Sequence, residues 1–341
     1  MPYEIVRNAP LDRLSTFRLP ATAAELVSLE DAAALPDLLD TELPVLVLGG
    51  GSNTLFVEDF PGRIVINRLR GIDSEIIDRD RVLVTAAAGE DWHELVRWTL
   101  DRGLWGMENL AMIPGRVGAA PMQNIGAYGV ELAHCLESVE VFDRRTGEIE
   151  WLAASECGLD YRDSRFKSAD RDRFIILGIR LELMMHGTPV LEYPSLLEEL
   201  KRNGHSQPDD PRTVAAAVMR VRKRKLPDPA VVPSAGSFFK NPVVDNETAR
   251  ALADRHPELP TWPDKPGQTK LSAGWLVDQL GWRGKSVGGA QVFDRHALVL
   301  TNAGGASGRD VLDLARDIKA GVNDRFGIEL EPEPVLIGGS L

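Results

Sequence analysis

The sequence has few of the residues that build disulfide-bonded or metal-binding proteins. Only Cys135 and Cys157 occur among the 341 residues, and they do not form a CxxC pair. A disulfide framework or a zinc site would need more cysteines, or cysteines and histidines at ligand spacing. We therefore predict that both cysteines are small buried residues and that the chain binds no metal.

Long apolar runs and an excess of positive charge are also missing. No apolar run reaches the ~18 residues of a membrane-spanning helix, and the first residues do not resemble a secretory signal peptide. The formal net charge is -12. Nucleic-acid phosphates would repel such a chain unless its basic residues were grouped. We expect a cytoplasmic protein with neither a nucleic acid nor a membrane as partner.

The chain does have the composition of a globular protein of two or three domains. Hydrophobic residues make up 43% and charged residues 26%, which suffices for a sizeable core. Up to about residue 185 the strand patterns do not alternate regularly with helices, so the fold class is α+β. The strands are expected on either side of a glycine turn within 44–57, at 64–67, 82–87 and 174–183, and as a hairpin at 138–151.

Capping residues predict several helices. Asp91, with Glu94 three residues later, predicts a helix over 92–102. Further start signals predict helices that begin at Pro194, run over 211–225 and 273–280, and extend from Ser307 to about Arg325 before Gly327. The segment 256–270, with four prolines, predicts a surface insertion.

Three successive glycines follow the first of the apolar strands. Gly49, Gly50 and Gly51 permit close approach of another group, and Ser52 and Asn53 add hydrogen-bond donors. Consecutive backbone N–H groups can form an anion site for a diphosphate. From these residues alone, a simple tight turn between two strands is an equally good interpretation.

A second segment, IPGRVGAAPMQNIGAYG at 113–129, is dense in small residues and proline. Small side chains let a large flat ligand, such as an isoalloxazine ring, lie against the main chain. Gln123 and Asn124 could read its hydrogen-bonding edges. The alternative is an Ω-loop packed on itself.

These two segments and five others resemble one enzyme family along nearly the whole chain. The others are YRDSRFK at 161–167, KLPDP at 225–229, AGSFFKNP at 235–242, AGWLVDQLGWRG at 273–284 and LEPE at 330–333. The sequence is similar to the UDP-N-acetylenolpyruvoylglucosamine reductases (UDP-N-acetylmuramate dehydrogenases) of bacterial cell-wall synthesis. The segment around Tyr193 suggests the longer subclass of that family.

The resemblance implies a two-subdomain FAD-binding fold of the vanillyl-alcohol-oxidase type, followed by a C-terminal α+β substrate-binding domain. The expected boundaries are 1–68 with 328–341, 69–205, and 206–327. It also implies NADPH-dependent reduction of UDP-N-acetylglucosamine enolpyruvate, with noncovalent FAD, NADPH as co-substrate and a monomeric protein. The implied cofactor-binding residues are Gly49, Gly50, Gly51, Ser52, Asn53, Ile113, Pro114, Gly115, Gly118, Ala119, Gln123, Asn124, Gly126, Ala127, Tyr128 and Gly129.

That reaction needs a cation for the charge developing on the substrate carboxylate, and an acid that protonates C2. A guanidinium can grip a carboxylate through two hydrogen bonds. The resemblance places the catalytic arginine at Arg162, the proton donor at Ser237 and the third catalytic residue at Glu333. Without the motifs, a surface arginine, a turn serine and a solvated glutamate would be the simpler interpretations.

Basic residues crowd the end of the helix predicted at 211–225. They could favour the helix C-terminus electrostatically, or they could capture an anionic substrate. The resemblance assigns only Lys225 to the substrate diphosphate, with Tyr193 and Asn241 as other substrate contacts. His296 departs from the glutamine common in the longer subclass, so a structural histidine is the better interpretation there.

Two other functions are possible from the motifs. An FAD-linked oxidase could use the same flavin fold on another substrate, but such oxidases lack GSFFKNP and the C-terminal LEPE. A nucleotide-binding module without catalysis would not need Arg162, Ser237 and Glu333 together.

Overall fold

The computed structural model describes residues 3–341, and their contacts divide them into two compact units. Unit 1 contains the chain up to Asn8, Ala24–Gly50 and Pro61–Arg224. Unit 2 contains Ala9–Ala23, Gly51–Phe60 and Lys225–Leu341. The division into three domains expected from the sequence stays a prediction.

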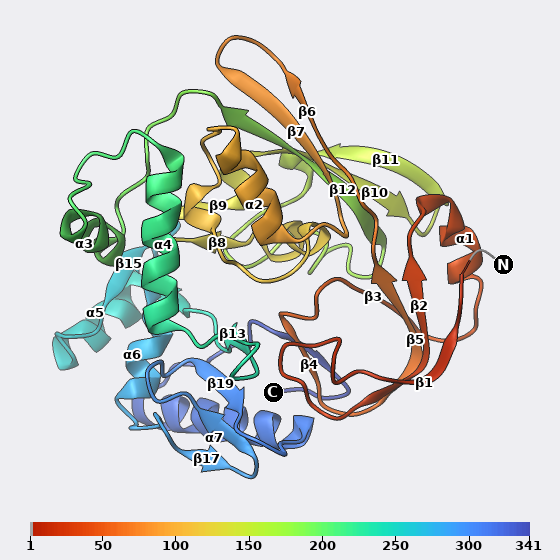
Figure 1. The fold of residues 1–341 in the computed structure, drawn as a ribbon. Coiled ribbons are helices and arrows are strands. Elements are labelled where there is room, and N and C mark those ends of the chain that lie inside the picture. Colours follow the sequence, from red (N-terminus) through yellow and green to blue (C-terminus); the bar gives the residue numbers. More distant parts are fainter. Residues whose placement is uncertain (1–2) are drawn as a thin grey trace. The chain divides into compact units, whose positions relative to one another are not determined.

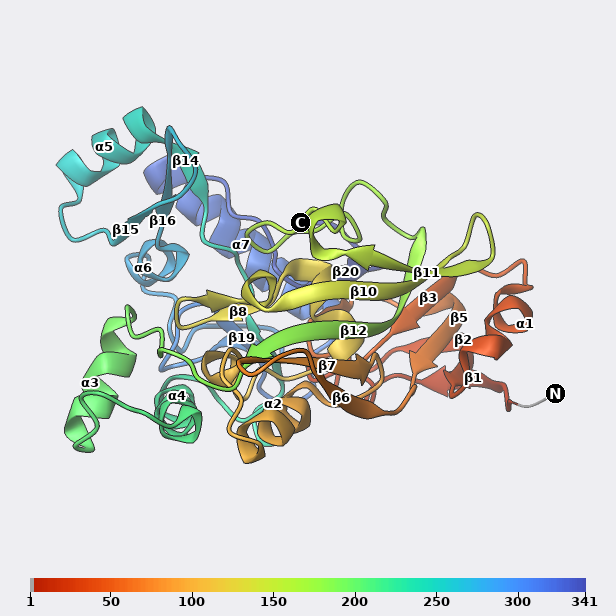
Figure 2. The same cartoon turned by 90° about the horizontal axis from the view of Figure 1, so that it is seen from above.

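The largest sheet of unit 1 is antiparallel and has five strands (Figures 1 and 2). The predicted strands at 82–87 and 174–183 and the hairpin at 138–151 are confirmed, and Gly147 turns the hairpin with a φ of 75°. Strand β6 was not predicted because its residues are mostly polar and exposed. The strand order is β11 (Glu148–Ala153), β10 (Leu136–Asp143), β12 (Phe174–Met184), β7 (Arg81–Ala87), β6 (Ile72–Ile76).

A smaller sheet lies at the start of the chain and leads to the glycine turn. Strands β3 and β5 pair in parallel, and β5 covers the segment predicted at 64–67. Because β3 ends at Leu48, the three glycines follow directly on a paired strand. The strand order is β1 (Val6–Pro10), β2 (Thr22–Leu29), β5 (Phe60–Asn67), β3 (Val45–Leu48).

Three of the four α-helices described in unit 1 begin where the sequence predicted them, and the short helix α1 was not predicted. The Asp91 carboxylate accepts hydrogen bonds from the backbone N–H of His93 and Glu94, at 3.0 and 3.2 Å. The Glu94 carboxylate bonds Arg97, not the cap. The helices are α1 (Leu35–Leu39), α2 (Trp92–Asp101), α3 (Pro194–Arg202) and α4 (Pro211–Lys225).

The small-residue segment folds into short turns, as expected from its lack of periodicity. A 3₁₀ helix at Glu108–Leu110 precedes the segment, and two more, Val117–Ala119 and Pro121–Gln123, lie within it. The strands β8 (Gly126–Ala127) and β9 (Val130–Glu131) then form a minimal hairpin. Backbone hydrogen bonds of the 3₁₀ helices and the hairpin thus hold this segment in place.

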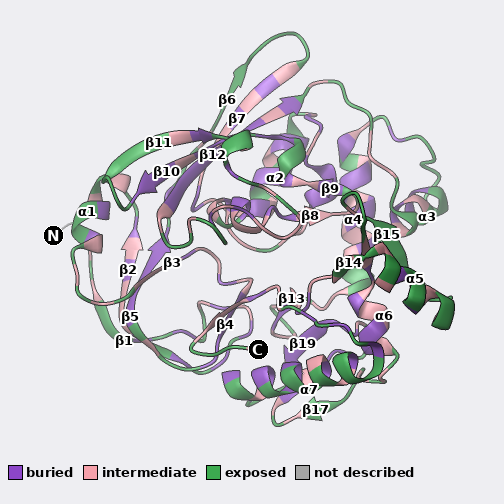
Figure 3. Cartoon of the chain, turned by 180° about the vertical axis from the view of Figure 1, so that it is seen from behind, coloured by how far each residue is buried: buried purple, intermediate pink, exposed green. Residues whose placement is uncertain are grey.

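Unit 2 is built around helix α7 (Gly308–Phe326), whose buried and exposed faces alternate in Figure 3. Ser307 and Asp310 cap its start reciprocally, and Gly327 ends it with a φ of 68°. The Pro-rich segment is exposed but not irregular, since it contributes strands to a small sheet. The other elements of unit 2 are α5 (Asn246–Arg255), α6 (Ala273–Asp278), β4 (Thr54–Phe56) with β20 (Val335–Ile337), β14 (Val243–Asp245) with β16 (Gln268–Leu271) and β15 (Thr261–Pro263), and β13 (Ser234–Ser237) with β19 (Val299–Asn302), β18 (Ala290–Val292) and β17 (Ser286–Val287).

The two cysteines are buried, free thiols, as predicted. Burial raises the pKa of Cys135 to about 12 and that of Cys157 to about 11. Within residues 3–341, no helix has the length and apolarity needed to span a bilayer.

Candidate active site

The first two glycines of the turn pack against the start of the small-residue loop. A Cβ at Gly50 would lie 3.1 Å from Gly115 Cα, and a Cβ at Gly49 would lie 3.2 Å from Arg116 Cβ. Side chains at these positions would push the two segments apart. Within unit 1, the fold therefore joins two of the segments predicted to bind the cofactor.

The rest of the turn is held by distant parts of unit 2. Gly51 has a φ of 58°, and a Cβ there would lie 1.9 Å from the carbonyl oxygen of Leu14. The Asn53 amide donates to the Glu333 carbonyl at 3.1 Å, and the Val335 N–H donates to the Asn53 carbonyl at 2.9 Å. The predicted diphosphate turn is thus tied to the predicted catalytic segment at the C-terminus.

Asn124 holds the small-residue loop in shape through its side chain. It has a left-handed φ of 42°, and its amide donates to Glu131 at 2.8 Å and to the Asp160 carbonyl at 3.2 Å. Its oxygen accepts from the Ala133 N–H at 3.0 Å. The side chain of Asn124, a predicted cofactor-binding residue, therefore also fixes the shape of the loop.

Arg162 lies at the tip of a tight turn beside that loop. Its φ is 53°, and the flanking Asp160 and Asp163 pair with each other through their backbones. The guanidinium donates to the Gly126 carbonyl at 3.0 Å. Ser164 donates to the Met122 carbonyl at 2.7 Å, so the serine supports the turn. Arg162 is therefore anchored on the segment predicted to line the flavin.

A second arginine near Arg162 is Arg222, one of the basic residues that crowd the end of α4, which was given no separate role from the sequence. Burial lowers the pKa of Arg222, as does the positive charge of Arg162, while Tyr128 opposes the shift. Burial raises the pKa of Tyr128 to about 12, so its hydroxyl stays protonated as a donor. The helical position of Arg222, three residues before Lys225, could have pointed to it.

Ser237 and Glu333 belong to neighbouring segments of unit 2. Ser237 ends β13 opposite Val299, after Gly236 with a φ of 73°. The carbonyl oxygen of the next residue, Phe238, accepts a hydrogen bond from the Glu333 N–H at 2.8 Å. Phe238 and Phe239 are each 1% exposed and belong to the hydrophobic core of unit 2. The backbone hydrogen bond thus joins the predicted third catalytic residue to the residue that follows the predicted acid.

The neighbouring polar residues of this segment already have structural partners. The Asn241 side-chain oxygen accepts from the Ala273 N–H at 3.0 Å, at the start of α6. Lys240 pairs with the exposed Glu331 at 3.1 Å. This ion pair favours Glu333 over Glu331 for the catalytic role. The substrate contact expected of Asn241 stays a prediction.

Lys225 is exposed, and its charge acts on His296. Burial first, then the charges of Lys225 and Arg283, lower the pKa of His296 to about 4. The Nδ1 atom of His296 accepts from the Leu298 N–H at 3.3 Å, which orients the ring. A neutral, hydrogen-bonded ring agrees with the structural histidine expected from the sequence.

Tyr193 lies beside the flavin loop in unit 1. It is the N-cap residue of α3, with Pro194 in the first turn, and is 43% exposed. Its ring meets that of Tyr128 edge to face, with centroids 5.1 Å apart. The predicted substrate contact is thus next to a predicted cofactor contact.

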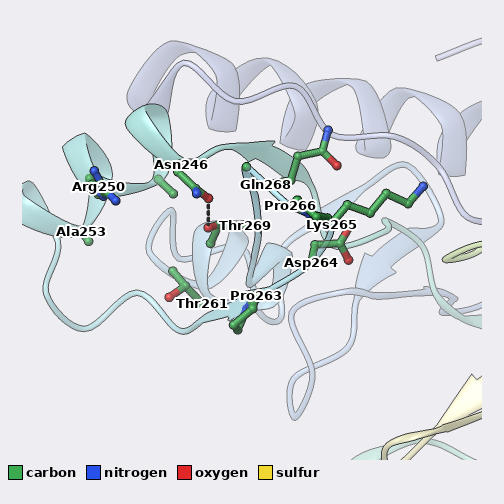
Figure 4. Close-up of a pocket in the computed structure, with 12 residues that line it drawn as sticks. Asn246, Arg250, Ala253, Thr261, Pro263, Asp264, Lys265, Pro266, Gln268 and Thr269 are labelled. Carbon is green, nitrogen blue, oxygen red and sulfur yellow. Dashed lines mark hydrogen bonds between the residues drawn. The ribbon is translucent and has the colours of Figure 1, made fainter.

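A pocket of about 580 Å³ in unit 2 belongs to a different surface (Figure 4). It lies between α5 and the small sheet of β14–β16, and the Asn246 and Thr269 side chains bond across it at 2.8 Å. None of the residues predicted for catalysis, cofactor or substrate lines it. The volume of this pocket therefore does not identify it as the active site.

Comparison with known proteins agrees with this geometry. The family model "FAD binding domain" matches residues 19–153, and the model of the UDP-N-acetylenolpyruvoylglucosamine reductase C-terminal domain matches residues 228–337. The chain is 46% identical to such reductases from Burkholderia vietnamiensis, over 98% of both chains, and Burkholderia multivorans, over 98% and 97%.

Solved structures show the same fold. The crystal structure of the Thermus caldophilus reductase matches with a TM-score of 0.66 and 29% identity, over 98% of this chain and 99% of that one. A solvent-stable cholesterol oxidase matches with a TM-score of 0.50 at 11% identity, over 97% and 87%, which indicates a shared fold only. The predicted α+β fold, with an FAD-binding domain and a C-terminal reductase domain, is confirmed. The chain belongs to the UDP-N-acetylenolpyruvoylglucosamine reductase family of oxidoreductases.

Proposed function

We propose that this protein reduces UDP-N-acetylglucosamine enolpyruvate to UDP-N-acetylmuramate with NADPH, in the cytoplasmic synthesis of peptidoglycan precursors. The observation that carries this proposal is the 46% identity, along 98% of both chains, to a protein named for the reaction. The protein acts on a small UDP-sugar as a monomer.

The residues of unit 1 fit a bound FAD. Gly49 and Gly50 leave no room for side chains where they meet Gly115 and Arg116, so backbone groups of both segments are available to a diphosphate and a flat ring. When bound, FAD takes up a hydride from NADPH and supplies it to C3 of the enolpyruvyl group. Tyr128 contributes a protonated hydroxyl to this environment.

The chain's own groups stabilise charge and deliver a proton. Arg162, held by the Gly126 carbonyl, binds the substrate carboxylate as negative charge develops there. Ser237 gives its proton to C2. Glu333, whose backbone bonds the residue after Ser237, assists in stabilising the intermediate of the substrate. Lys225, Tyr193 and Asn241 bind the UDP part.

The purified protein should show a flavin absorption band that NADPH bleaches and the enolpyruvyl sugar restores. Full turnover should require both substrates and yield one UDP-N-acetylmuramate per NADPH. Rapid reoxidation by O₂, with no response to the sugar, would instead indicate an oxidase. A protein without flavin that binds UDP-sugars would exclude the reductase.

A further inference from the structure

Helix α3 carries a buried carboxylate that no part of the proposed reaction uses. The side chain of Glu199 is only 3% exposed. Its two oxygens meet Arg220 at 2.8 Å, Arg224 at 2.7 Å and Arg202 at 3.2 Å. The Asn203 amide adds a fourth donor at 2.9 Å. Every acceptor position of this carboxylate is therefore directed at a donor.

These bonds join two helices that the chain separates by a loop. Arg220 and Arg224 belong to α4, whereas Glu199 belongs to α3, and the two helices lie side by side in Figures 1 and 2. Arg220 and Arg224 are four residues apart and so share one face of α4. Hydrogen bonds from Arg224 and Arg220, working against burial, lower the pKa of Glu199 to about 2. Glu199 is therefore an anion at neutral pH, as its arginine partners require.

The same helix positions Tyr193. Tyr193 is the N-cap residue of α3, and its carbonyl accepts the N–H groups of Leu196 and Leu197 at 3.0 and 3.1 Å. Any shift of α3 against α4 must therefore move Tyr193. The helix is only nine residues long, and helices this short depend on tertiary contacts for their stability.

The chain before Tyr193 has a second anchor. The buried Asn109 amide donates to the Val190 carbonyl at 3.0 Å and to the Tyr128 carbonyl at 2.8 Å. Asn109 thus fixes the approach to Tyr193 on the flavin loop, and Glu199 fixes the helix after it. Tyr193, 43% exposed, lies between the two anchors.

We propose that Glu199 is a positioning residue for substrate binding: by tying α3 to Arg220 and Arg224, it holds Tyr193 where the uridine diphosphate part of the substrate binds. This inference rests on the proposed function. The partners of the Glu199 carboxylate are Arg202, Arg220, Arg224 and Asn203, none of which is assigned to the substrate or the flavin. Loss of the carboxylate should therefore raise KM for the UDP-sugar and leave flavin reduction by NADPH nearly unchanged.

Glu199→Gln removes the charge and keeps the shape, and Glu198→Gln on the exposed side of the same helix is the matched control. We expect KM for the enolpyruvyl sugar to rise at least fivefold in Glu199→Gln, with kcat within twofold of wild type. Amide hydrogen exchange in 194–203 should become at least tenfold faster. Glu198→Gln should match wild type in both. An unchanged KM would overturn the proposal.

The variant Tyr193→Ala distinguishes a role of Glu199 through Tyr193 from a general structural defect. If Glu199 acts through Tyr193, Glu199→Gln should raise KM less than twofold when Tyr193 is already alanine. A full fivefold rise in that background would refute the role through Tyr193. If Glu199→Gln does not fold, Arg220→Gln breaks one bond between α3 and α4, and a threefold rise in KM is expected; no rise would count against the proposal.

Failure of the proposed function has a different signature. If the wild-type protein does not turn over the enolpyruvyl sugar, the reductase assignment fails before any variant is made. UDP then serves as the probe, and calorimetry compares its affinity for wild type, Glu199→Gln and Glu198→Gln. Weaker binding only in Glu199→Gln supports the positioning role, and equal binding by all three refutes it.

Discussion

Ser237 follows Gly236, whose positive φ of 73° redirects the backbone at the end of β13. A serine hydroxyl is a weak acid in water, so it can protonate C2 only in a site that stabilises the resulting oxygen. Phe238 and Phe239, each 1% exposed, belong to the hydrophobic core of unit 2. The hydroxyl is therefore on a rigid element, as a positioned acid requires.

Ser237→Ala should separate the two halves of the reaction. FAD content and the rate of flavin bleaching by NADPH should stay near wild type, because the residues that hold the flavin are untouched. Reoxidation by the enolpyruvyl sugar should fall ~10²- to 10⁴-fold, the usual contribution of a positioned general acid. Stopped-flow absorbance measures both rates. The exposed Ser286 of the same sheet provides the control, Ser286→Ala, and equal loss of both rates in Ser237→Ala would mean a structural serine.

His296 should make the protein sensitive to acid. Its pKa is about 4 in the folded protein against 6.5 for the free side chain. Between pH 6.5 and pH 4 this histidine binds a proton in the unfolded chain but not in the folded one. The free energy of unfolding is therefore highest above pH 6.5 and falls as the pH approaches 4. The difference in free energy of unfolding between His296→Gln and wild type should therefore shift in favour of the variant, by on the order of 2 kcal/mol, between pH 7 and pH 4.5.

Urea unfolding midpoints at pH 7 and pH 4.5 test this prediction. His186→Gln, which changes an exposed histidine, should follow wild type at both values. A His296→Gln variant whose midpoint falls with pH as steeply as that of wild type would show that His296 does not contribute to the acid sensitivity.

The glycine turn after β3 is constrained at all three positions, for two different reasons. Gly49 and Gly50 allow close packing on the small-residue loop, whereas Gly51 combines a φ of 58° with the carbonyl of Leu14. A methyl group at Gly51 would lie 1.9 Å from that oxygen, so the turn or the Leu14 segment must move. The adjacent Ser52 and Asn53 would then move as well.

Gly51→Ala should consequently lower the melting temperature by several degrees and cause loss of FAD on purification, since strain and clash together exceed ~1 kcal/mol. Gly204→Ala is the control, because Gly204 has a φ of 79° but nothing within 4 Å of an added Cβ. Flavin absorbance per chain and thermal unfolding give the result. If the two variants lost the same amount of flavin and melted at the same temperature, the contact with Leu14 would not be the cause.

Helices and strands with strong local signals were predicted well. The caps at Asp91, Ser272 and Ser307 accept backbone N–H groups as expected. Strand β6 was missed because its residues are mostly polar and exposed, so it lacks the alternation on which strand prediction depends. The strands β15 and β16 of the Pro-rich segment have only three and four residues, too few to show a periodicity. Helix α5 was missed although Asp245 caps it.

The protein as purified should carry FAD without a covalent bond. Covalent attachment needs a nucleophilic side chain at the flavin, and the loop at 113–129 contains no histidine or cysteine. Cys135, the nearest cysteine in sequence, is buried, and its pKa of about 12 keeps the thiol protonated. Acid precipitation should release all of the yellow colour into the supernatant, measured by absorbance. Colour retained on the pellet would contradict the prediction.

By itself, the sequence determined most of the α-helices, the strands that flank the glycine turn, much of the five-stranded sheet of unit 1, and which motifs identify a flavin-dependent reductase. Caps, glycine turns and apolar alternation act between residues a few positions apart, so they can be read directly from the chain. Only the tertiary structure decided that Gly50 meets Gly115, that Asn53 bonds Glu333, and that Glu199 binds two arginines of another helix. A buried carbonyl or carboxylate needs a partner, but its identity depends on which distant segments the folded backbone brings within hydrogen-bonding distance.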